Sequence, residues 1–411
     1  MKLLMSSLLF LFLSCTLSSV EISRIDDLEP AHVPAPINFS QNIELDHPDF
    51  SKALLQIAGG DYSAAVKTFN TLSIMTDNPE LKRKAEKAAI NLMFNISAWD
   101  LLSDISLSRF HGDTTGKYLA MAYATGEIER YVFKSGKFEI PMKLSASGSP
   151  LIGVIVNGEP FVFWLDTGAG LSVVSSRVAE ICGIKPIDTS HNTYAVASTG
   201  KKIPVKPVII KEVKIGDLTI LNHPAMLINE DDLTFKLLKV ITVFKIDGII
   251  GWNAIRNLDI EIDYENEKTT IRHLEKRNID RRNFFWFFAP TVSLFSIGHA
   301  PLYFSLDTGA NRTTLLGNAF SRIDTSKIEY VSVRTASAGG MIKTRNFRLK
   351  NHTFLFENYR LFFREILGSN TSASENERIF QFDGILGSDV FRHGKIRLDI
   401  LNGRLDFENY N

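Results

Sequence analysis

Paired cysteines, clustered histidines and an excess of either charge are all missing from this chain. Its only two cysteines, Cys15 and Cys182, exclude a disulfide framework, and its nine histidines form no zinc-binding pattern. It also has no phosphate-binding glycine loop and no Gly-x-Ser-x-Gly motif. Because 46 basic residues balance 46 acidic ones, we expect no nucleic-acid partner; the sequence also predicts no metal centre and no cofactor.

Long hydrophobic runs are scarce as well. The apolar stretch Leu3 to Leu13 is shorter than the ~20 residues that a membrane-spanning helix needs. With its flanks it makes residues 1–20 resemble a secretory signal peptide, which predicts a secreted, periplasmic or cell-envelope protein. Cys15 lies where a bacterial lipoprotein carries its lipid anchor; the alternative is an ordinary signal peptide that contains a cysteine. Cys182 follows an apolar face and is expected to be a small buried hydrophobe.

The length of 411 residues predicts more than one domain, since a single core usually stops growing at ~250–300 residues. Residues 21–48 have no apolar period and are predicted to be a leader that lies across the surface or stays mobile. Residues 49–136 are predicted to be helical, and Gly60 to Phe69 resembles the centre of a tetratricopeptide repeat. We expect a small α-helical domain that either packs against the rest of the chain or binds a protein partner.

From about residue 137 the pattern changes to short alternating runs of Val, Ile and Phe, which are typical of β-strands. Asn157-Gly158 is the strongest short signal for a hairpin. Residues 137–274 and 284–411 are predicted to be two β-rich lobes, joined by the charged stretch Glu275 to Arg282. The aromatic run Phe284 to Phe288 is either a core between the lobes or a membrane patch.

The tripeptide Asp-Thr-Gly occurs twice, at residues 166–168 and 307–309, each time after an apolar run and before Ala. The two copies lie 141 residues apart (307 minus 166). A second landmark, Asp247 to Gly251, is matched by Asp383 to Gly387 at an offset of 136 (383 minus 247). A β-turn explains one Asp-Thr-Gly by itself, but not the matched flanks and order. The pattern favours an internal duplication in which each lobe offers one carboxylate to a shared site.

These motifs resemble those of the aspartic peptidases, and more closely the retroviral-type (retropepsin-like) branch. Ala169 and Ala310 follow the glycines as they do in that branch. Gly251-Trp-Asn253 and Gly387-Ser-Asp389 resemble its Gly-Arg-Asn/Asp ending but lack the arginine. The resemblance covers residues 138–411 and implies hydrolysis of a protein or peptide substrate. With the helical segment, it predicts a mainly β, bilobal acid-protease-like β-barrel fold with a small N-terminal α-helical domain.

The chemistry of such a site requires two carboxyl groups in contact. Because both cannot ionise cheaply, Asp166 and Asp307 are the candidate catalytic pair, in which one activates a water and the protonated one polarises a peptide carbonyl. The neighbours predicted to support this dyad are Thr167, Gly168, Thr308 and Gly309. The threonine hydroxyls can bond to the opposite strand, and the glycines let backbone N–H groups approach the carboxylates.

Two hairpins after the motifs resemble flaps that exclude water from the site. Their tips contain Ser198, Thr199 and Gly200 in the first hairpin, and Gly339 and Gly340 in the second. The alternative is a pair of ordinary solvent-exposed hairpins. For the whole chain, the rival hypothesis is a non-catalytic peptide-binding or scaffold protein with a protease-like cleft and a helical region that binds a partner.

Overall fold

The structure is a computed structural model. It describes residues 20–25, 47–189, 191–197, 200–237, 241–279, 281–296, 300–323, 328–337, 340–369 and 379–411. The predicted signal peptide, with Cys15, and most of the predicted leader lie outside these ranges. Within them, every helix is too short or too polar to cross a bilayer.

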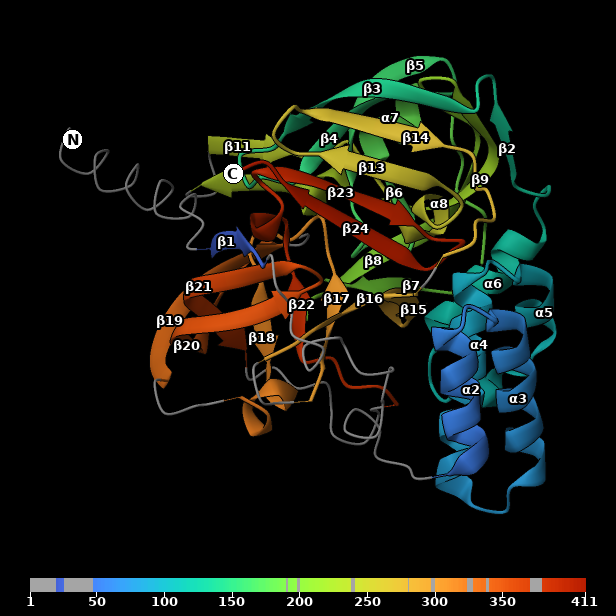
Figure 1. Ribbon diagram of the computed structural model, residues 1–411. Helices are drawn as coiled ribbons and strands as arrows, with labels where there is room; N and C mark the ends of the chain where they lie inside the picture. Colours follow the sequence, from blue (N-terminus) through green and yellow to red (C-terminus); the bar gives the residue numbers. More distant parts are fainter. Residues whose placement is uncertain are drawn as a thin grey trace.

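A group of helices comes first along the chain and stands beside the β-rich part (Figure 1). Its members are α2 (Pro48–Ala58), α3 (Tyr62–Met75), α4 (Pro79–Asn95), α5 (Trp99–Asp104), η2 (Leu107–Phe110) and α6 (Thr114–Ala124). Asn78 determines where α4 begins, because its Oδ1 accepts the N–H groups of Glu80 and Leu81 at 3.0 and 3.1 Å. Phe50 and Phe69, both fully buried, join α2 to α3 with ring centroids 5.0 Å apart.

The predicted helical segment, residues 49–136, is not helical at its end. Within the predicted helical segment 49–136, Arg130–Phe133 forms the strand β2, which pairs antiparallel with residues 218–221. Its sequence, Arg-Tyr-Val-Phe, has two aromatic residues and one β-branched residue, which favour a strand once a sheet edge is available. The last helix of the N-terminal helical region, α6, therefore ends at Ala124.

The first β lobe is a closed barrel. Its elements are β3 (Lys137–Leu144), β4 (Pro150–Val156), β5 (Glu159–Leu165), β6 (Ser172–Ser175), α7 (Ser176–Ile181), β7 (Thr193–Val196), β8 (Lys202–Ile215), β9 (Leu218–Ile228), η3 (Glu230–Leu233), β12 (Gly248–Ile250), α8 (Trp252–Ile255), β13 (Asp259–Asp263) and β14 (Lys268–Arg272). Six strands pair in the order β4-β5-β12-β6-β9-β8, and β8 pairs back to β4. Asn157 and Gly158 have positive φ values of 47° and 96°, as the tight turn from β4 to β5 requires. A separate small sheet is made by β10 (Thr234–Leu237) and β11 (Ile241–Lys245).

The second lobe repeats this order of pairing. Its elements are β15 (Phe284–Phe287), β16 (Ala289–Leu294), β17 (Leu302–Leu306), β18 (Thr314–Leu316), η4 (Gly317–Ser321), β19 (Ile328–Ser337), β20 (Gly340–Phe356), β21 (Tyr359–Ser369), β22 (Gly384–Leu386), η6 (Ser388–Val390), β23 (Gly394–Asp399) and β24 (Arg404–Asn409). The order β16-β17-β22-β18-β21-β20 follows that of the first barrel strand by strand. The fold is therefore mainly β and bilobal with a small N-terminal helical domain, as the sequence predicts.

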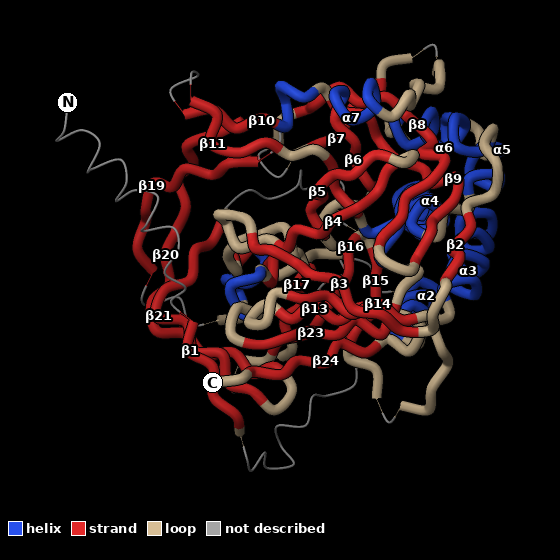
Figure 2. Tube along the Cα trace, turned by 90° about the horizontal axis from the view of Figure 1, so that it is seen from above, coloured by secondary structure: helices blue, strands red, loops and turns tan. Residues whose placement is uncertain are grey.

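One sheet joins the two lobes. β13 of the first lobe and β23 of the second run antiparallel, with Ile260 opposite Leu398 and Ile262 opposite Ile396. Strands β3, β14, β13, β23 and β24 therefore lie side by side, as Figure 2 shows. All four facing side chains are fully buried, so apolar packing adds to the backbone hydrogen bonds across this joint.

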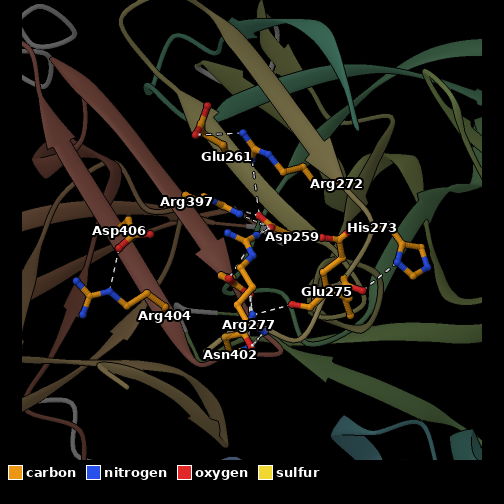
Figure 3. A network of polar contacts seen from close by, with 12 residues as sticks. Asp259, Glu261, Arg272, His273, Glu275, Arg277, Arg397, Asn402, Arg404 and Asp406 are labelled. Carbon is orange, nitrogen blue, oxygen red and sulfur yellow. Dashed lines mark hydrogen bonds and ion pairs between the residues drawn. The ribbon is translucent and has the colours of Figure 1, made fainter. Parts of the chain in front are cut away.

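The predicted linker takes part in a buried ion-pair network at the same joint (Figure 3). Asp259 on β13 accepts Nε and Nη2 of Arg397 on β23 at 2.9 and 2.6 Å. Arg277 of the linker reaches the same carboxylate at 2.5 Å, and Arg272 on β14 lies 3.7 Å away. Because the Asp259 side chain is 1% exposed, it depends on these arginines to compensate its charge.

The edge of the second lobe holds a strand that the sequence did not predict. Val20–Arg24, at the start of the described chain, forms β1. It pairs antiparallel with residues 359–363 of β21. Residues 21–24 of the predicted leader, with Val20 of the predicted signal peptide, are thus a strand at a sheet edge, and these residues are not a mobile segment.

The aromatic run that opens the second lobe packs against both other parts of the chain. Phe284 meets Trp252 of the first lobe with centroids 6.1 Å apart, which places this end of the run between the lobes. Trp286 instead stacks on Tyr62 of the helical region at 3.8 Å. The run is therefore only partly the predicted inter-lobe core, and it also fixes the helices to the second lobe.

Cys182 differs from its prediction. Its side chain is half-buried, with Sγ 3.2 Å from the carbonyl oxygen of Val156. Partial burial raises the pKa of this thiol. The residue caps the C-terminal end of α7, next to Ile181, which is exposed.

Candidate active site

Both motif aspartates stand at the end of a strand and are held by a neighbouring one. Asp166 follows β5, and its N–H donates to the carbonyl of Ile250 at 3.0 Å. Asp307 follows β17, and its N–H donates to the carbonyl of Leu386 at the same distance. Ile250 and Leu386 end β12 and β22, each of which pairs parallel with the strand that carries the aspartate. The two motif loops therefore begin in the same way.

The carboxyl group of each aspartate lies against the glycine of the other motif. A Cβ added to Gly168 would stand 2.4 Å from Cγ of Asp307, and one added to Gly309 would stand 2.5 Å from Cγ of Asp166. Each glycine therefore leaves the space that the opposite carboxyl group occupies, a stronger requirement than room for a backbone N–H. The two carboxyl groups are close enough for the charge of Asp307 to raise the pKa of Asp166.

The motif threonines bond reciprocally across the two loops. Oγ1 of Thr167 donates to the carbonyl of Leu306 at 2.8 Å and accepts the N–H of Thr308 at 3.0 Å. Oγ1 of Thr308 donates to the carbonyl of Leu165 at 2.8 Å and accepts the N–H of Thr167 at 3.0 Å. Both side chains are almost completely buried, so four backbone groups depend on these two hydroxyls. We call these four hydrogen bonds the threonine grip. Because each threonine directly follows its aspartate, the grip fixes the distance between the two aspartates.

The pKa of each aspartate is raised. Burial, followed by the charge of Asp307, raises the pKa of Asp166 to about 8, although the N–H of Gly168 at 2.8 Å acts in the opposite direction. Burial also raises the pKa of Asp307, while the N–H of Ala310, 2.9 Å from Oδ1, lowers it. Two carboxyl groups in contact titrate as a pair in two steps. Between these steps, one of them holds a proton and the other is ionised.

Behind each loop, a hydroxyl is bound by a residue of the short helix that follows β12 or β22. Oδ1 of Asn253 accepts the N–H and the hydroxyl of Ser172 at 2.8 and 3.1 Å. Oδ1 of Asp389 accepts the N–H and the hydroxyl of Thr313 at 2.9 and 2.7 Å. Sequence reasoning missed Ser172 and Thr313. Their common position, six residues after Asp166 (172 minus 166) and after Asp307 (313 minus 307), is the signal that identifies them.

The first lobe extends this support with a buried histidine. Nε2 of His223 lies 2.8 Å from Oγ of Ser172, and Nδ1 of the same ring bonds the carboxylate of Glu129. Ser172 and His223 are both buried. Their hydroxyl and imidazole groups are therefore closed to a substrate and act as a support behind the Asp166 loop.

Of the predicted flap residues, only Gly200 and Gly340 belong to the described chain, and Ser198, Thr199 and Gly339 lie outside it. Gly200 has a φ of 79°, and its N–H donates to the carbonyl of Ala197 at 2.7 Å, which forms a tight turn between β7 and β8. Gly340 pairs with Ser337 at the end of the β19–β20 hairpin. Ala197 borders the same apolar cluster as Trp164, two residues before Asp166. The base of the first hairpin is thus anchored beside the strand that carries Asp166.

The site brings an acid and a base together. In the chain as described, no group of three or more His, Cys, Asp or Glu side chains could hold a metal ion. Two carboxyl groups that face one another, both with raised pKa values, can provide one proton donor and one proton acceptor at the same place. Such a pair can activate a water and protonate a leaving group in one cycle.

Comparison with known proteins gives a family match over part of the chain. Residues 152–254, which include Asp166, match a family model described as aspartyl protease. No curated protein matches the chain. Among solved structures, the chain is similar to a retropepsin-like aspartic protease from Rickettsia conorii at 17% identity, over 36% of this chain and 94% of that one, with a TM-score of 0.24. The family match covers a part of the first lobe, from β4 to α8.

Proposed function

We propose that the chain is an aspartic endopeptidase that hydrolyses peptide bonds with a water activated by Asp166 and Asp307. One observation carries the proposal: each carboxyl group fills the space above the glycine of the other motif, so the two aspartates face one another across the motif loops. A pair of unrelated β-turns has no need of this contact. Burying two carboxyl groups together raises the free energy of their ionised forms, which a site for proton transfer can use.

The residues divide the reaction between them. The ionised carboxylate takes a proton from the water, and the protonated carboxyl group polarises the carbonyl of the scissile bond. During attack the protonated group gives its proton to the carbonyl oxygen. When the intermediate collapses, the first group gives the proton it took from water to the leaving amine, and the second group takes a proton back from a hydroxyl of the intermediate, which restores the starting state. The grip of Thr167 and Thr308 holds the pair in this geometry, and Gly168 and Gly309 leave the space it needs. A substrate bound as an extended strand suits a cleft between β-rich lobes.

We also propose where the protein acts and what its helical region does. The signal-like residues 1–20 favour secretion or retention in the cell envelope, with Cys15 as the candidate lipid anchor. The helical region packs on both lobes, through the stacking of Tyr62 on Trp286 and the hydrogen bond from Tyr123 to Ala225. Packing is thus its first role, and a protein partner would bind its outer face.

A mixed peptide library, incubated with the protein at intervals from pH 3 to pH 8, tests the activity. We expect cleavage at internal bonds with a bell-shaped pH dependence, and none by the double variant Asp166→Asn/Asp307→Asn. The double variant keeps the size of both side chains, so it also serves as a control for folding. Peptides that bind at every pH yet stay intact would contradict the proposal and favour a peptide-binding protein instead.

A further inference from the structure

A serine of the first lobe bonds the motif loop of the second lobe. Ser149 lies in the turn between β3 and β4 and is completely buried. Its hydroxyl donates to the carbonyl oxygen of Gly309 at 3.0 Å. Ser149 thus connects the first lobe to the Asp307 loop, in addition to the threonine grip.

The bond acts on a peptide unit that already serves the dyad. The carbonyl of Gly309 and the N–H of Ala310 belong to one peptide group, and that N–H donates to Oδ1 of Asp307 at 2.9 Å. A hydrogen bond accepted by the carbonyl polarises the peptide and strengthens the bond that its N–H donates. The ionised form of Asp307 gains from this, because a stronger donor stabilises the carboxylate more than the acid.

The other half of the dyad lacks such a serine. Leu151 faces Trp164 in the first barrel, and Thr291 faces Ser305 in the second. Trp164 and Ser305 each stand two residues before their aspartate, so Leu151 and Thr291 are equivalent.

The counterpart of Ser149, two residues before Leu151, is therefore Ala289, which has no hydroxyl. The equivalent N–H on the other side, that of Ala169, lies 3.2 Å from Oδ1 of Asp166, a longer contact than its partner makes.

We infer that Ser149 is a positioning residue that makes the dyad unequal, so that Asp307 is the carboxylate that ionises first and Asp166 is the one that keeps the shared proton. The effect on the pH dependence of cleavage rests on the proposed function. The difference between the pKa values of the two aspartates does not, because it is a property of the folded chain. The pKa of Asp166, raised to about 8, agrees with the assignment of the proton to that residue.

The other ionisable groups near the two aspartates are the same in the Ser149→Ala and Ser147→Ala variants that are compared below. The buried phenol of Tyr264 feels the charge of both aspartates, and burial raises its pKa, so it stays neutral below pH 8. Asp389 is bound by Thr313 behind the Asp307 loop, and Arg392 lies beside Gly148. None of these groups bonds the hydroxyl of Ser149 in the contacts described.

The pH dependence of cleavage separates a positioning role from a structural one. In Ser149→Ala, the acid limb should move to higher pH by about half a unit, which lowers activity there by about threefold, because the pKa of Asp307 rises without the polarised peptide. The basic limb, which follows loss of the proton held by Asp166, should stay in place. Ser147→Ala is the matched control, since its hydroxyl lies 3.3 Å from that of Ser149 in the same turn and does not bond Gly309.

A titration that needs no activity completes the test. In the Asp166→Asn background, the Asp307 carboxyl signal is followed by ¹³C NMR from pH 3 to pH 9, with and without Ser149→Ala. A higher pKa of Asp307 in the serine variant supports the inference even if no peptide is ever cleaved. An unchanged pKa, or an equal shift in Ser147→Ala, overturns it even if the protein is an active peptidase.

Discussion

The first lobe closes its barrel with two residue pairs between β4 and β8, Ile155 with Lys214 and Val156 with Val213. Within the residues that the structure describes, the second lobe closes at the equivalent place with one bridge, Phe295 with Leu355. The outer edges differ in origin as well: β2 covers β9 in the first lobe, and β1, from far earlier in the chain, covers the equivalent strand β21 in the second. The pairings next to the aspartates are the same in both lobes, and the lobes diverge with distance from them. The strand pairings that the two lobes share are therefore those that position the aspartates, and the pairings that only close the barrel differ.

The hairpins predicted as flaps show the same divergence. In the second lobe, β19 and β20 pair over ten residues, from Ile328 with Leu349 to Ser337 with Gly340. In the first lobe, β7 pairs with β8 over only four, but α6 supports it, since the N–H of Tyr194 donates to Oγ1 of Thr115 at 3.2 Å. One hairpin is thus stabilised by its own length and the other by the helical region.

Removing the charge at the joint between the lobes should have the largest effect on stability. In Asp259→Ala, the partly exposed guanidinium groups of Arg397 and Arg277 lose three hydrogen bonds to a buried carboxylate, and we expect unfolding to become easier by about 3–5 kcal/mol, discounted for the exposure of the arginines. Asp406→Ala is the matched control, because Asp406 is half exposed and its pair with Arg404 lies at the surface, worth at most about 1 kcal/mol. Urea denaturation measures both; similar losses in the two variants would contradict a joint that depends on this network.

A methyl group in the space between the aspartates should lower turnover strongly. Gly168→Ala and Gly309→Ala each place a Cβ within 2.5 Å of the opposite Cγ, so the carboxyl group must move, and we expect kcat to fall by about a hundredfold. Gly170→Ala should have little effect, since a Cβ there meets nothing within 4 Å. Steady-state cleavage of one peptide compares the three variants. Full activity of either motif variant would show that the two carboxyl groups do not need this contact.

The threonine grip should contribute equally from both lobes. Thr167→Val leaves the carbonyl of Leu306 and the N–H of Thr308 without a partner, and Thr308→Val does the same to the carbonyl of Leu165 and the N–H of Thr167. We expect each variant to lose about 2–4 kcal/mol of stability, because two buried backbone groups become unsatisfied. Urea denaturation at constant pH measures this. A loss in only one variant would break the equivalence of the two loops.

Sequence alone predicts the parts of this fold that repeat. The Gly-Ile-Ile-Gly and Gly-Ile-Leu-Gly segments, ending at Gly251 and Gly387, indicate the supports of both aspartates because the same short strand is needed twice. The partner of β1 could not be predicted, since nothing in Val20–Arg24 specifies which sheet edge it joins. The hydrogen bond from Ser149 to Gly309 could not be predicted from the sequence either, because it depends on how the two lobes pack against one another.

The buried aspartates should make the stability of the protein depend on pH. A carboxyl group whose pKa is raised in the folded state binds more protons there than in the unfolded chain, so stability falls as pH rises between the two pKa values. For Asp166, with a folded pKa of about 8, this window runs from about pH 4 to pH 8. Asp166→Asn removes the group, so the variant should lose less thermal stability than the parent over this range. Equal changes in Tm between pH 4 and pH 8 would contradict the burial of an ionisable pair.

The most direct test of the central claim compares kcat/KM for Asp166→Asn, for Asp307→Asn and for the double variant. If the two carboxyl groups form one catalytic unit, each single change should lower kcat/KM by roughly a thousandfold or more, and the double change should cost little beyond either one. Peptide affinity, measured by displacement of an uncleaved ligand, should change far less. If one aspartate proved dispensable, or the two losses multiplied, the lobes would not share a site.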